Sequence, residues 1–202
     1  IIGDKSLSRR DFQRVTSPLK QFGARFVSKN ESNLPLTISG SEYLRPINYF
    51  EKKGSAQCKS SVIFAGLNTP GKTIIKAKKS RDHTELFLRY LNIPLKIIKG
   101  KQFDKIELTG GNQFKSFNYI IPGDMSSSAF FIVLTLLLKN SKLKIKNVNI
   151  NPTRIGFIKI INKMGAKVRF IKKKKLYGEY FADICVNSQK SFKPIKCPVE
   201  LN

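Results

Sequence analysis

The stretch of this chain with the clearest chemical potential is GSAQCKSS at residues 54–61, which precedes the apolar run 62–67. Small hydroxyl residues followed by apolar ones indicate a helix whose first turn is open while its body is buried. The first N–H groups of a helix lack internal partners, and the helix dipole makes that end partly positive. Ser55 can cap the helix, Gln57 can reach over its end, and small side chains let an anion approach. The pattern predicts a phosphate-binding helix start, although an ordinary capped core helix explains these residues, taken alone, better.

Two further polar stretches precede apolar patterns. SRDHTE at residues 80–85 contains Arg81 and the only histidine, His83, which we interpret as a helix-start residue rather than a catalyst. For Arg81 the alternative is an ion pair with Asp82 or Glu85. PGDMSSSAFF at residues 122–131 places Asp124 and three serines before an apolar helix, and we interpret it as a structural helix entry.

The composition describes a globular chain. With 202 residues and 41% hydrophobic content, it can bury a core as one domain or as two small halves. No apolar run reaches the roughly eighteen residues of a membrane span, and no signal peptide is recognisable. The three cysteines are widely spaced and indicate neither a disulfide framework nor a zinc site. A reducing cytoplasm is the expected compartment.

The net charge of +25 is compatible with nucleic-acid binding. However, the lysines are spread along the chain except for the run Lys172–Lys175, which we place in a β-turn region. The joint abundance of Lys, Asn, Ile and Phe is typical of a drift towards A/T-rich codons. We therefore favour a solvated basic surface that attracts small anions, and keep a basic nucleic-acid-binding module as an alternative.

Alternating helices and strands are expected to position these residues. A helix with Ser6 or Ser8 as its N-cap should run to Gly23, with a kink or restart at Pro18. Other helices are expected from Ser55, around Leu86–Leu91, over 129–138 and from Asn151 to Gly165. Strands are expected at 24–27, 33–40, 73–77, 95–98, 105–108, 142–148 and 166–170, with a strand or loop at 45–50.

The chain also contains an internal repeat. PLKQFGARF at residues 18–26 and IINKMGAKVRF at 160–170 both read as a helix end, a glycine stop, an alanine and a strand. A helix–strand–helix–strand–strand block recurs at roughly sixty-residue intervals, which predicts a repeated α/β unit rather than one wound sheet.

Four segments together resemble the enolpyruvylshikimate-phosphate (EPSP) synthases, which join phosphoenolpyruvate to shikimate 3-phosphate. They are GDKSLSRRDFQRVTSPLKQFGARF (3–26), GSAQCKSSVIFAGLNTPGKT (54–73) with SRDHTE, IPGDMSSSAFF (121–131) and NINPTRIGFIKIINKMGAKV (149–168). They stand in the family's order, cover essentially the whole chain, and are most similar to the class called glyphosate-insensitive. The chain departs from the family at Asp11, where the usual motif is Arg-Pro-Met.

The resemblance implies an α/β fold of repeated βαβαββ units, an inside-out α/β barrel of the enolpyruvyl transferase type. In that family two domains enclose a cleft into which helix N-termini point. Residues 1–122 would then be part of the N-terminal domain, and residues 123–202 the truncated start of the C-terminal domain. The chain would be an internal fragment of a longer enzyme.

The resemblance also assigns substrate contacts. Those to shikimate 3-phosphate are Ser55, Ala56, Gln57, Ser80 and Arg81. Those to phosphoenolpyruvate are Arg10 and Gln57, and a two-pronged arginine suits that carboxylate and phosphate. For Arg10 the alternatives are a surface arginine or a pair with Asp11. No catalytic residue is expected in this chain, because the general base and the later Lys-Glu and Arg clusters should lie beyond residue 202.

The function implied is transfer of the enolpyruvyl group to the 5-hydroxyl of shikimate 3-phosphate with release of phosphate, on the route to chorismate and the aromatic amino acids. No metal or organic cofactor, no membrane and no nucleic acid is implied, and the full-length enzyme is expected to be a cytoplasmic monomer. The fragment alone is expected to be inactive. A relative of the enolpyruvyl transferase that acts on UDP-N-acetylglucosamine is the alternative within the same chemistry.

Overall fold

Helices and strands alternate along the chain in the computed structural model, which describes residues 1–28, 32–111 and 115–198. The chain divides into two units, and the division does not follow the sequence simply. The first unit consists of residues 1–80 and 91–115, and the second of residues 81–90 and 116–202. The domain boundary between residues 122 and 123 stays a prediction for the parent enzyme, because these units reflect contacts within this chain alone.

A four-stranded mixed sheet forms the centre of the first unit, in the order β3 (Asn48–Glu51), β4 (Gly71–Lys78), β6 (Phe103–Gly110) and β5 (Leu95–Ile98). β3 and β4 are parallel, and the other neighbours are antiparallel. Helix α2 (Ala56–Leu67) packs on this sheet. Gly66 lies inside the helix, and a Cβ there would stand 2.9 Å from Leu108 Cδ1. Its missing side chain therefore permits close helix–sheet packing.

A smaller part of the first unit consists of α1 (Gln13–Phe22), β1 (Arg25–Ser28) and β2 (Leu36–Ser39). The two strands form an antiparallel pair. α1 is one helix through Pro18, without a restart there, and it ends at Gly23, as predicted, with φ +117°. The predicted caps Ser6 and Ser8 do not start it. Instead Ser6 precedes a short 3-10 helix, η1 (Leu7–Arg9).

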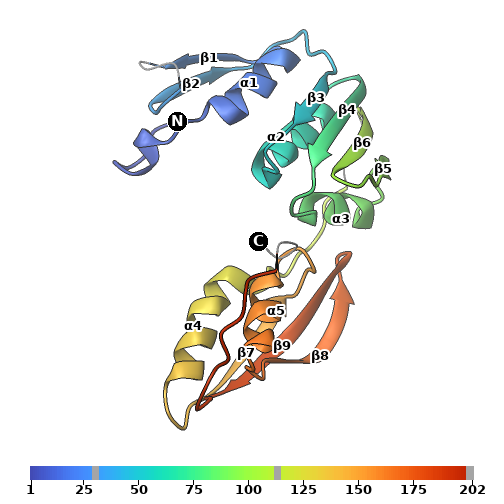
Figure 1. Cartoon of the computed structure of the whole chain (residues 1–202). Helices are drawn as coiled ribbons and strands as arrows, with labels where there is room; N and C mark the ends of the chain where they lie inside the picture. The colour runs from blue at the N-terminus through green and yellow to red at the C-terminus, as the bar shows by residue number, and fades with distance from the viewer. Residues whose placement is uncertain (29–31, 112–114, 199–202) are drawn as a thin grey trace. The chain divides into compact units, whose positions relative to one another are not determined.

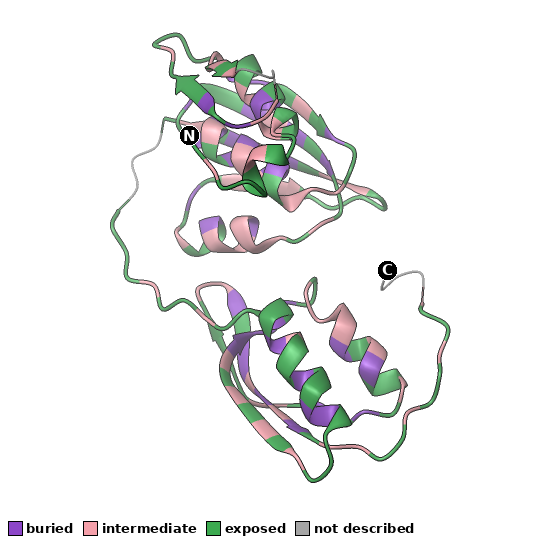
Figure 2. Cartoon of the chain, turned by 90° about the vertical axis from the view of Figure 1, so that its left-hand side faces the viewer, coloured by how far each residue is buried: buried purple, intermediate pink, exposed green. Residues whose placement is uncertain are grey.

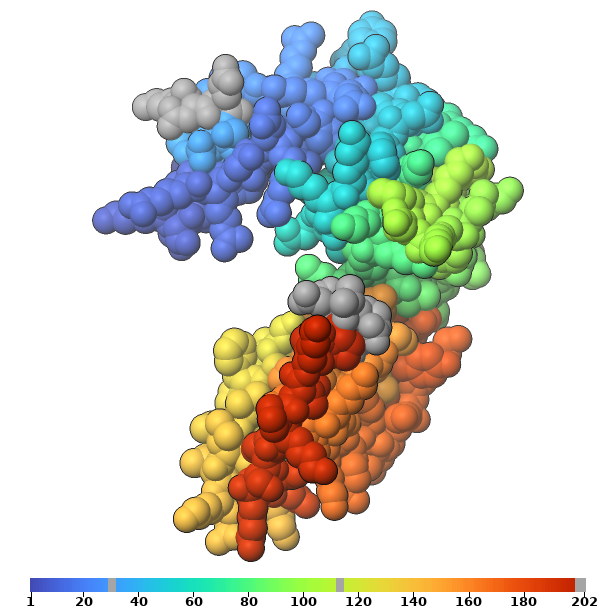
Figure 3. Space-filling view, in the orientation of Figure 1, coloured from blue at the N-terminus to red at the C-terminus, as the bar shows by residue number. Residues whose placement is uncertain are grey.

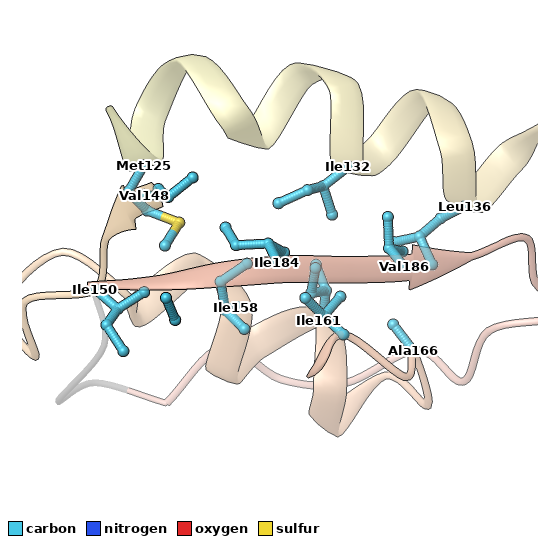
Figure 4. Packing of buried hydrophobic residues seen from close by; sticks show 12 residues of the cluster. Met125, Ile132, Leu136, Val148, Ile150, Ile158, Ile161, Ala166, Ile184 and Val186 are labelled. Carbon is cyan, nitrogen blue, oxygen red and sulfur yellow. The ribbon is translucent and has the colours of Figure 1, made fainter. Parts of the chain in front are cut away.

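The second unit has a three-stranded antiparallel sheet in the order β7 (Lys142–Asn149), β9 (Glu179–Asn187) and β8 (Arg169–Leu176). α4 (Met125–Leu137) and α5 (Gly156–Lys163) direct apolar residues to it. Figure 4 shows Ile132 and Leu136 of α4 facing Ile184 and Val186 of β9. Ile132 and Ile184 have no exposed surface, so this face of the sheet is the core of the unit.

The segment after β9 completes this core. The backbone N–H of Gln189 donates to Leu136 O on α4 (3.1 Å), and that of Lys193 donates to Met164 O after α5 (2.9 Å). Phe192 packs against the same apolar cluster. Figure 3 shows this red segment lying between the yellow α4 and the orange part of the unit. It therefore connects α4 to the end of α5 through backbone hydrogen bonds.

α3 (His83–Tyr90) belongs to the second unit, although β4 before it and β5 after it belong to the first. It packs against β9. The turn at Tyr177 and Gly178 joins β8 to β9, and a Cβ on Gly178 would stand 2.7 Å from the carbonyl oxygen of Leu86 in α3. The glycine thus serves both the turn and the docking of the helix.

The predicted repeat is confirmed in the order of the elements. One block, β3–α2–β4–α3–β5–β6, is a complete βαβαββ unit, and α4–β7–α5–β8–β9 repeats it without its first strand. A parallel bridge from Gly123 to Val148 stands in place of that strand. The second helix of each block is followed by a residue with positive φ, Asn92 after α3 and Gly165 after α5, and Gly23 follows α1 in the same way. The spacing of these three residues is somewhat longer than the roughly sixty residues expected.

The lysine run of the second unit lies in a different element from the one predicted. The run Lys172–Lys175, predicted in a turn, lies within strand β8, because the chain turns only at Tyr177. All four lysines are exposed, which agrees with a solvated basic surface.

The helices of the second unit have one buried and one exposed face. Figure 2 shows exposed green residues alternating with buried purple ones on these helices. On α4 the exposed residues include Phe130, Phe131, Leu134 and Leu137.

Candidate functional site

The start of α2 has the open geometry that the sequence predicts. Ser55 is the N-cap, and its Oγ accepts from the backbone N–H of Cys58 (3.3 Å). The carbonyl oxygen of Ser55 accepts from Lys59 N (3.1 Å). The N–H groups of Ala56 and Gln57 are the first two of the helix, which a helix cannot satisfy internally. They are therefore donors directed outward at the positive end of the dipole.

A buried carboxylate holds the loop before this helix. Glu51, at the end of β3, is 4% exposed, and its two oxygens accept from Lys53 N (3.0 Å) and Gly54 N (2.6 Å). Gly54 has φ +78°, a conformation that side chains disfavour. Because Glu51 already accepts from the Lys53 and Gly54 amides, these two donors are not available to a ligand, whereas the first N–H groups of α2 are. The sequence analysis missed Glu51, since an acidic residue in a strand carries no signal of its loop partners.

A cation also stands at this helix start. Arg14, in the first turn of α1, donates from Nη2 to Gln57 Oε1 (3.2 Å), and both residues are exposed. The sequence analysis did not single out Arg14, and nothing local distinguishes it from the other arginines. Its guanidinium fixes the Gln57 amide and adds positive charge beside the outward N–H groups. The arrangement suits a phosphate or carboxylate.

Arg10 lies on the loop between η1 and α1. Its guanidinium is exposed, and its carbonyl oxygen accepts from Asn33 Nδ2 (3.1 Å). Asp11, the departure from the family motif, accepts from Gln13 N (2.7 Å) through Oδ1 and so supports the first turn of α1. The contact to Gln57 comes from Arg14, and no described hydrogen bond joins the Arg10 guanidinium to α2.

Ser80 and Arg81, adjacent in sequence, fall in different units. Ser80 follows β4 in the first unit, and its hydroxyl is buried without a hydrogen-bond partner among the described residues. Arg81 is exposed and lines a pocket of about 340 Å³ in the second unit. Ser55, Ala56 and Gln57 thus lie together at the start of α2 in the first unit, and Arg81 belongs to the second unit.

The pocket around Arg81 lies beside the start of α4. Asp124 caps α4 by accepting from Ser127 N (2.8 Å), which confirms the predicted helix entry. Arg154 donates from Nη2 to Asp124 Oδ1 (2.8 Å) and to Ser126 Oγ (2.6 Å). Partial burial opposes ionisation of Asp124, but the Ser127 hydrogen bonds and Arg154 outweigh it, so the pKa of the carboxyl is lowered. The Asp124 carboxyl is therefore ionised near neutral pH.

A buried polar network forms another wall of this pocket. His83 Nδ1 lies 2.7 Å from Glu179 Oε1, and because a carboxylate only accepts, Nδ1 carries the proton. Asn151 Nδ2 donates to the same Glu179 oxygen (2.9 Å) and to Asp82 Oδ1 (2.9 Å). Burial raises the pKa of Glu179, but the hydrogen bonds from His83, Asn151 and Asn149 lower it by more. The net result is a pKa below the usual value for a glutamate. His83 does begin a helix, as predicted, while Glu179 and Asn151 were missed.

Known proteins share this architecture. The enolpyruvyl transferase NikO from Streptomyces tendae aligns with 93% of the chain at a TM-score of 0.66 and 14% identity, which shows the fold of an enolpyruvyl transferase. EPSP synthase from Acinetobacter baumannii aligns with 99% of the chain and 44% of its own length, at a TM-score of 0.81 and 35% identity.

Sequence relatives agree with the structural ones. The 3-phosphoshikimate 1-carboxyvinyltransferase of Ruthia magnifica is 40% identical over the whole chain, and that of Streptococcus mutans is 44% identical over 83% of it. The family model described as EPSP synthase (3-phosphoshikimate 1-carboxyvinyltransferase) matches residues 1–199. The chain belongs to the EPSP synthase family. It spans 45% and 39% of the length of these two relatives.

Proposed function

We propose that this chain is part of an enzyme that transfers the enolpyruvyl group of phosphoenolpyruvate to the 5-hydroxyl of shikimate 3-phosphate and releases phosphate. The reaction belongs to the shikimate pathway, which leads to chorismate and the aromatic amino acids. The observation that carries the proposal is the start of α2, where Ser55, two outward N–H groups and Gln57 meet a guanidinium within one unit.

The α2 start supplies what shikimate 3-phosphate needs. A phosphate has several acceptor oxygens and no donor at full ionisation, so N–H, hydroxyl and amide donors around it complement its charge. We assign Ser55, Ala56 and Gln57 to shikimate 3-phosphate, with Gln57 extending to phosphoenolpyruvate. Ser80 and Arg81 are further proposed contacts to shikimate 3-phosphate, and Arg10 is a proposed contact to phosphoenolpyruvate.

These residues bind and orient rather than transfer protons. The 5-hydroxyl attacks C2 of protonated phosphoenolpyruvate, and the tetrahedral intermediate then loses phosphate. Such steps require positioned acids and bases and cations against developing charge. In this chain the proposed residues hold substrate anions, and the proton-transfer groups are assigned to the remainder of the enzyme.

The exposed apolar face of α4 supports a longer enzyme. Phe130 is 79% exposed and Leu137 is 67% exposed, on a helix whose other face fills the core. An apolar cluster of this kind is unusual for the surface of a finished domain. We propose that further repeats of the parent enzyme cover it. The 202-residue chain on its own should therefore bind an apolar dye such as ANS while folded.

Titration calorimetry with shikimate 3-phosphate tests the proposed function. The wild-type protein should bind the ligand, and Gln57→Ala should abolish binding at the same concentrations. Gln21→Ala is the matched control, because Gln21 is an exposed glutamine in the last turn of α1, away from the start of α2. This variant should bind normally. In the full-length enzyme, Gln57→Ala and Arg10→Ala should each reduce turnover sharply while changing the free energy of unfolding by no more than about 1 kcal/mol. A folded full-length enzyme that does not bind shikimate 3-phosphate would contradict the proposal.

Assays on the same full-length enzyme and its variants distinguish the proposed function from the alternative functions. Nucleic-acid binding that persists in Gln57→Ala and disappears when Lys172–Lys175 are replaced would favour a basic nucleic-acid-binding module, and its affinity should fall steeply with salt. Turnover of UDP-N-acetylglucosamine would favour the other enolpyruvyl transferase class. The glyphosate-insensitive subclass rests on motif similarity alone, and inhibition of the full-length enzyme by glyphosate tests it.

We propose that the enzyme acts in the cytoplasm as a monomer. The three cysteines are free, in agreement with a reducing compartment. None of the helices that the structure describes is long and apolar enough to cross a membrane. Sedimentation of the full-length enzyme tests the oligomeric state.

A further inference from the structure

The polar network next to Arg81 in the sequence includes Asn151, whose side-chain amide has all of its hydrogen-bonding positions occupied. Asn151 is 1% exposed, and its two amide hydrogens donate to the carboxylates of Asp82 and Glu179. Its oxygen accepts from the backbone N–H of Thr153 (2.8 Å) and from the Thr153 hydroxyl (2.7 Å). An amide has two donors and two acceptor positions, so its orientation is determined by these four partners.

Glu179 is the centre of the network. It is 5% exposed and begins β9, and its Oε1 accepts from both Asn151 and His83. Removing one partner from a buried charge group costs more than the hydrogen bond itself is worth, because the remaining groups stay desolvated. The carboxylate therefore ties β9 and residue 151 firmly to the start of α3.

The two residues held by this network directly follow Arg81. Asp82 is bound through Asn151, and its carbonyl oxygen accepts from Leu86 N (3.1 Å) inside α3. His83 is bound through Glu179. The backbone on the C-terminal side of Arg81 is thus fixed at two successive residues, while the arginine side chain lies exposed along the wall of the pocket. The Arg81 side chain is long and rotatable, so a fixed backbone origin narrows the volume that its guanidinium can sample.

We propose that Glu179 and Asn151 are positioning residues for Arg81, and that they set the affinity for the phosphorylated substrate through that arginine. This inference rests on the proposed function. A ligand bound by a preorganised arginine does not have to order it, so that part of the binding free energy is retained. In the absence of the network, Arg81 keeps its charge but loses its fixed starting point. Neither Glu179 nor Asn151 needs to touch the substrate.

A double-mutant cycle in the full-length enzyme separates positioning from a general loss of structure. Glu179→Gln keeps the shape of the side chain and removes its charge. We expect it to raise the Kd for shikimate 3-phosphate about tenfold, which corresponds to 1.4 kcal/mol. In an Arg81→Ala background the same change should alter the Kd by less than about twofold, because the group through which it acts is gone.

Asp183→Asn is the matched control. Asp183 lies on the same strand, accepts from Asn147 N (3.0 Å) and pairs with Lys144 (3.2 Å), so its loss disturbs β9 without involving Arg81. It should leave the Kd unchanged. If Glu179→Gln does not fold, His83→Gln replaces it, since the His83 side chain is 37% exposed and tolerates substitution better.

The outcomes distinguish this inference from the proposed function. A wild-type enzyme that fails to bind shikimate 3-phosphate refutes the proposed function, and the positioning inference with it. Wild-type binding together with an equal loss of affinity from Glu179→Gln in both backgrounds refutes positioning through Arg81 alone. Normal affinity in both Glu179→Gln and His83→Gln does the same. A loss that occurs only when Arg81 is present supports the inference.

Discussion

Replacing Ser55 by alanine and, separately, by glycine should separate the two tasks of its hydroxyl. In the free protein the hydroxyl accepts from Cys58 N and caps α2, and in the proposed complex it contacts the phosphate. An N-cap serine replaced by alanine costs about 0.5–2 kcal/mol, whereas glycine costs a few tenths. The 3.3 Å distance is at the long end for such a hydrogen bond, so we expect the alanine variant in the lower half of that range, at about 0.5–1 kcal/mol.

The ligand affinity should behave differently. Both variants lose the hydroxyl, and a hydrogen bond to a charged group is worth about 1.5–3 kcal/mol, so both should bind shikimate 3-phosphate roughly tenfold to a hundredfold more weakly. The stability difference should appear as a melting temperature a few degrees lower for Ser55→Ala, by about 2–4 °C per kcal/mol for a chain of this size. Ser55→Gly should melt close to the wild type.

Differential scanning calorimetry and ligand titration on the same three proteins make the comparison. Ser61→Ala is the control within the helix, because the Ser61 hydroxyl donates to Cys58 O (2.8 Å) and lies a turn beyond the helix start. It should bind the ligand as the wild type does. Unchanged affinity in Ser55→Gly would refute the reasoning, since the hydroxyl would then be a structural cap and no ligand contact.

Three further predictions concern the second unit. Ile132→Ala, at a side chain with no exposed surface, should lower the free energy of unfolding by about 2–5 kcal/mol, which denaturant titration measures. Gly178→Ala should also destabilise, by about 1–3 kcal/mol, because φ is +80° and the new Cβ would meet Leu86 O; a gain in stability would show that α3 is not held as described. The Glu179 pKa is lowered in the folded state, so its stabilisation is present above the unfolded value near 4.3 and is lost as the pH falls through the lower folded value. The difference in unfolding free energy between wild type and Glu179→Gln should therefore narrow as the pH falls below the unfolded pKa and through the lower folded one, and a constant difference would contradict this.

Local patterns predicted most elements because local forces decide them. Ser55 before an apolar run started α2, and Gly23 ended α1 because only a residue that tolerates positive φ suits that stop. The prediction of a turn at Lys172–Lys175 was wrong, because these residues lie within β8. Four lysines suggest a turn by composition, but the positive φ at Tyr177 and Gly178 makes the reversal there, and exposed lysines are compatible with an edge strand.

The sequence by itself determined the family, the α/β repeat and the open helix start at α2 that we propose as a substrate site, since each depends on contiguous residues. Only the tertiary structure decided which side chains support that motif and which support Arg81. Arg14 reaches Gln57 across 43 residues, and His83 meets Glu179 across 96. In the sequence nothing distinguishes Glu51 from other strand residues, and only the structure shows that its buried oxygens accept from the Lys53 and Gly54 amides. Hydrogen-bond partners depend on how the chain packs, so no spacing rule along the sequence predicts them.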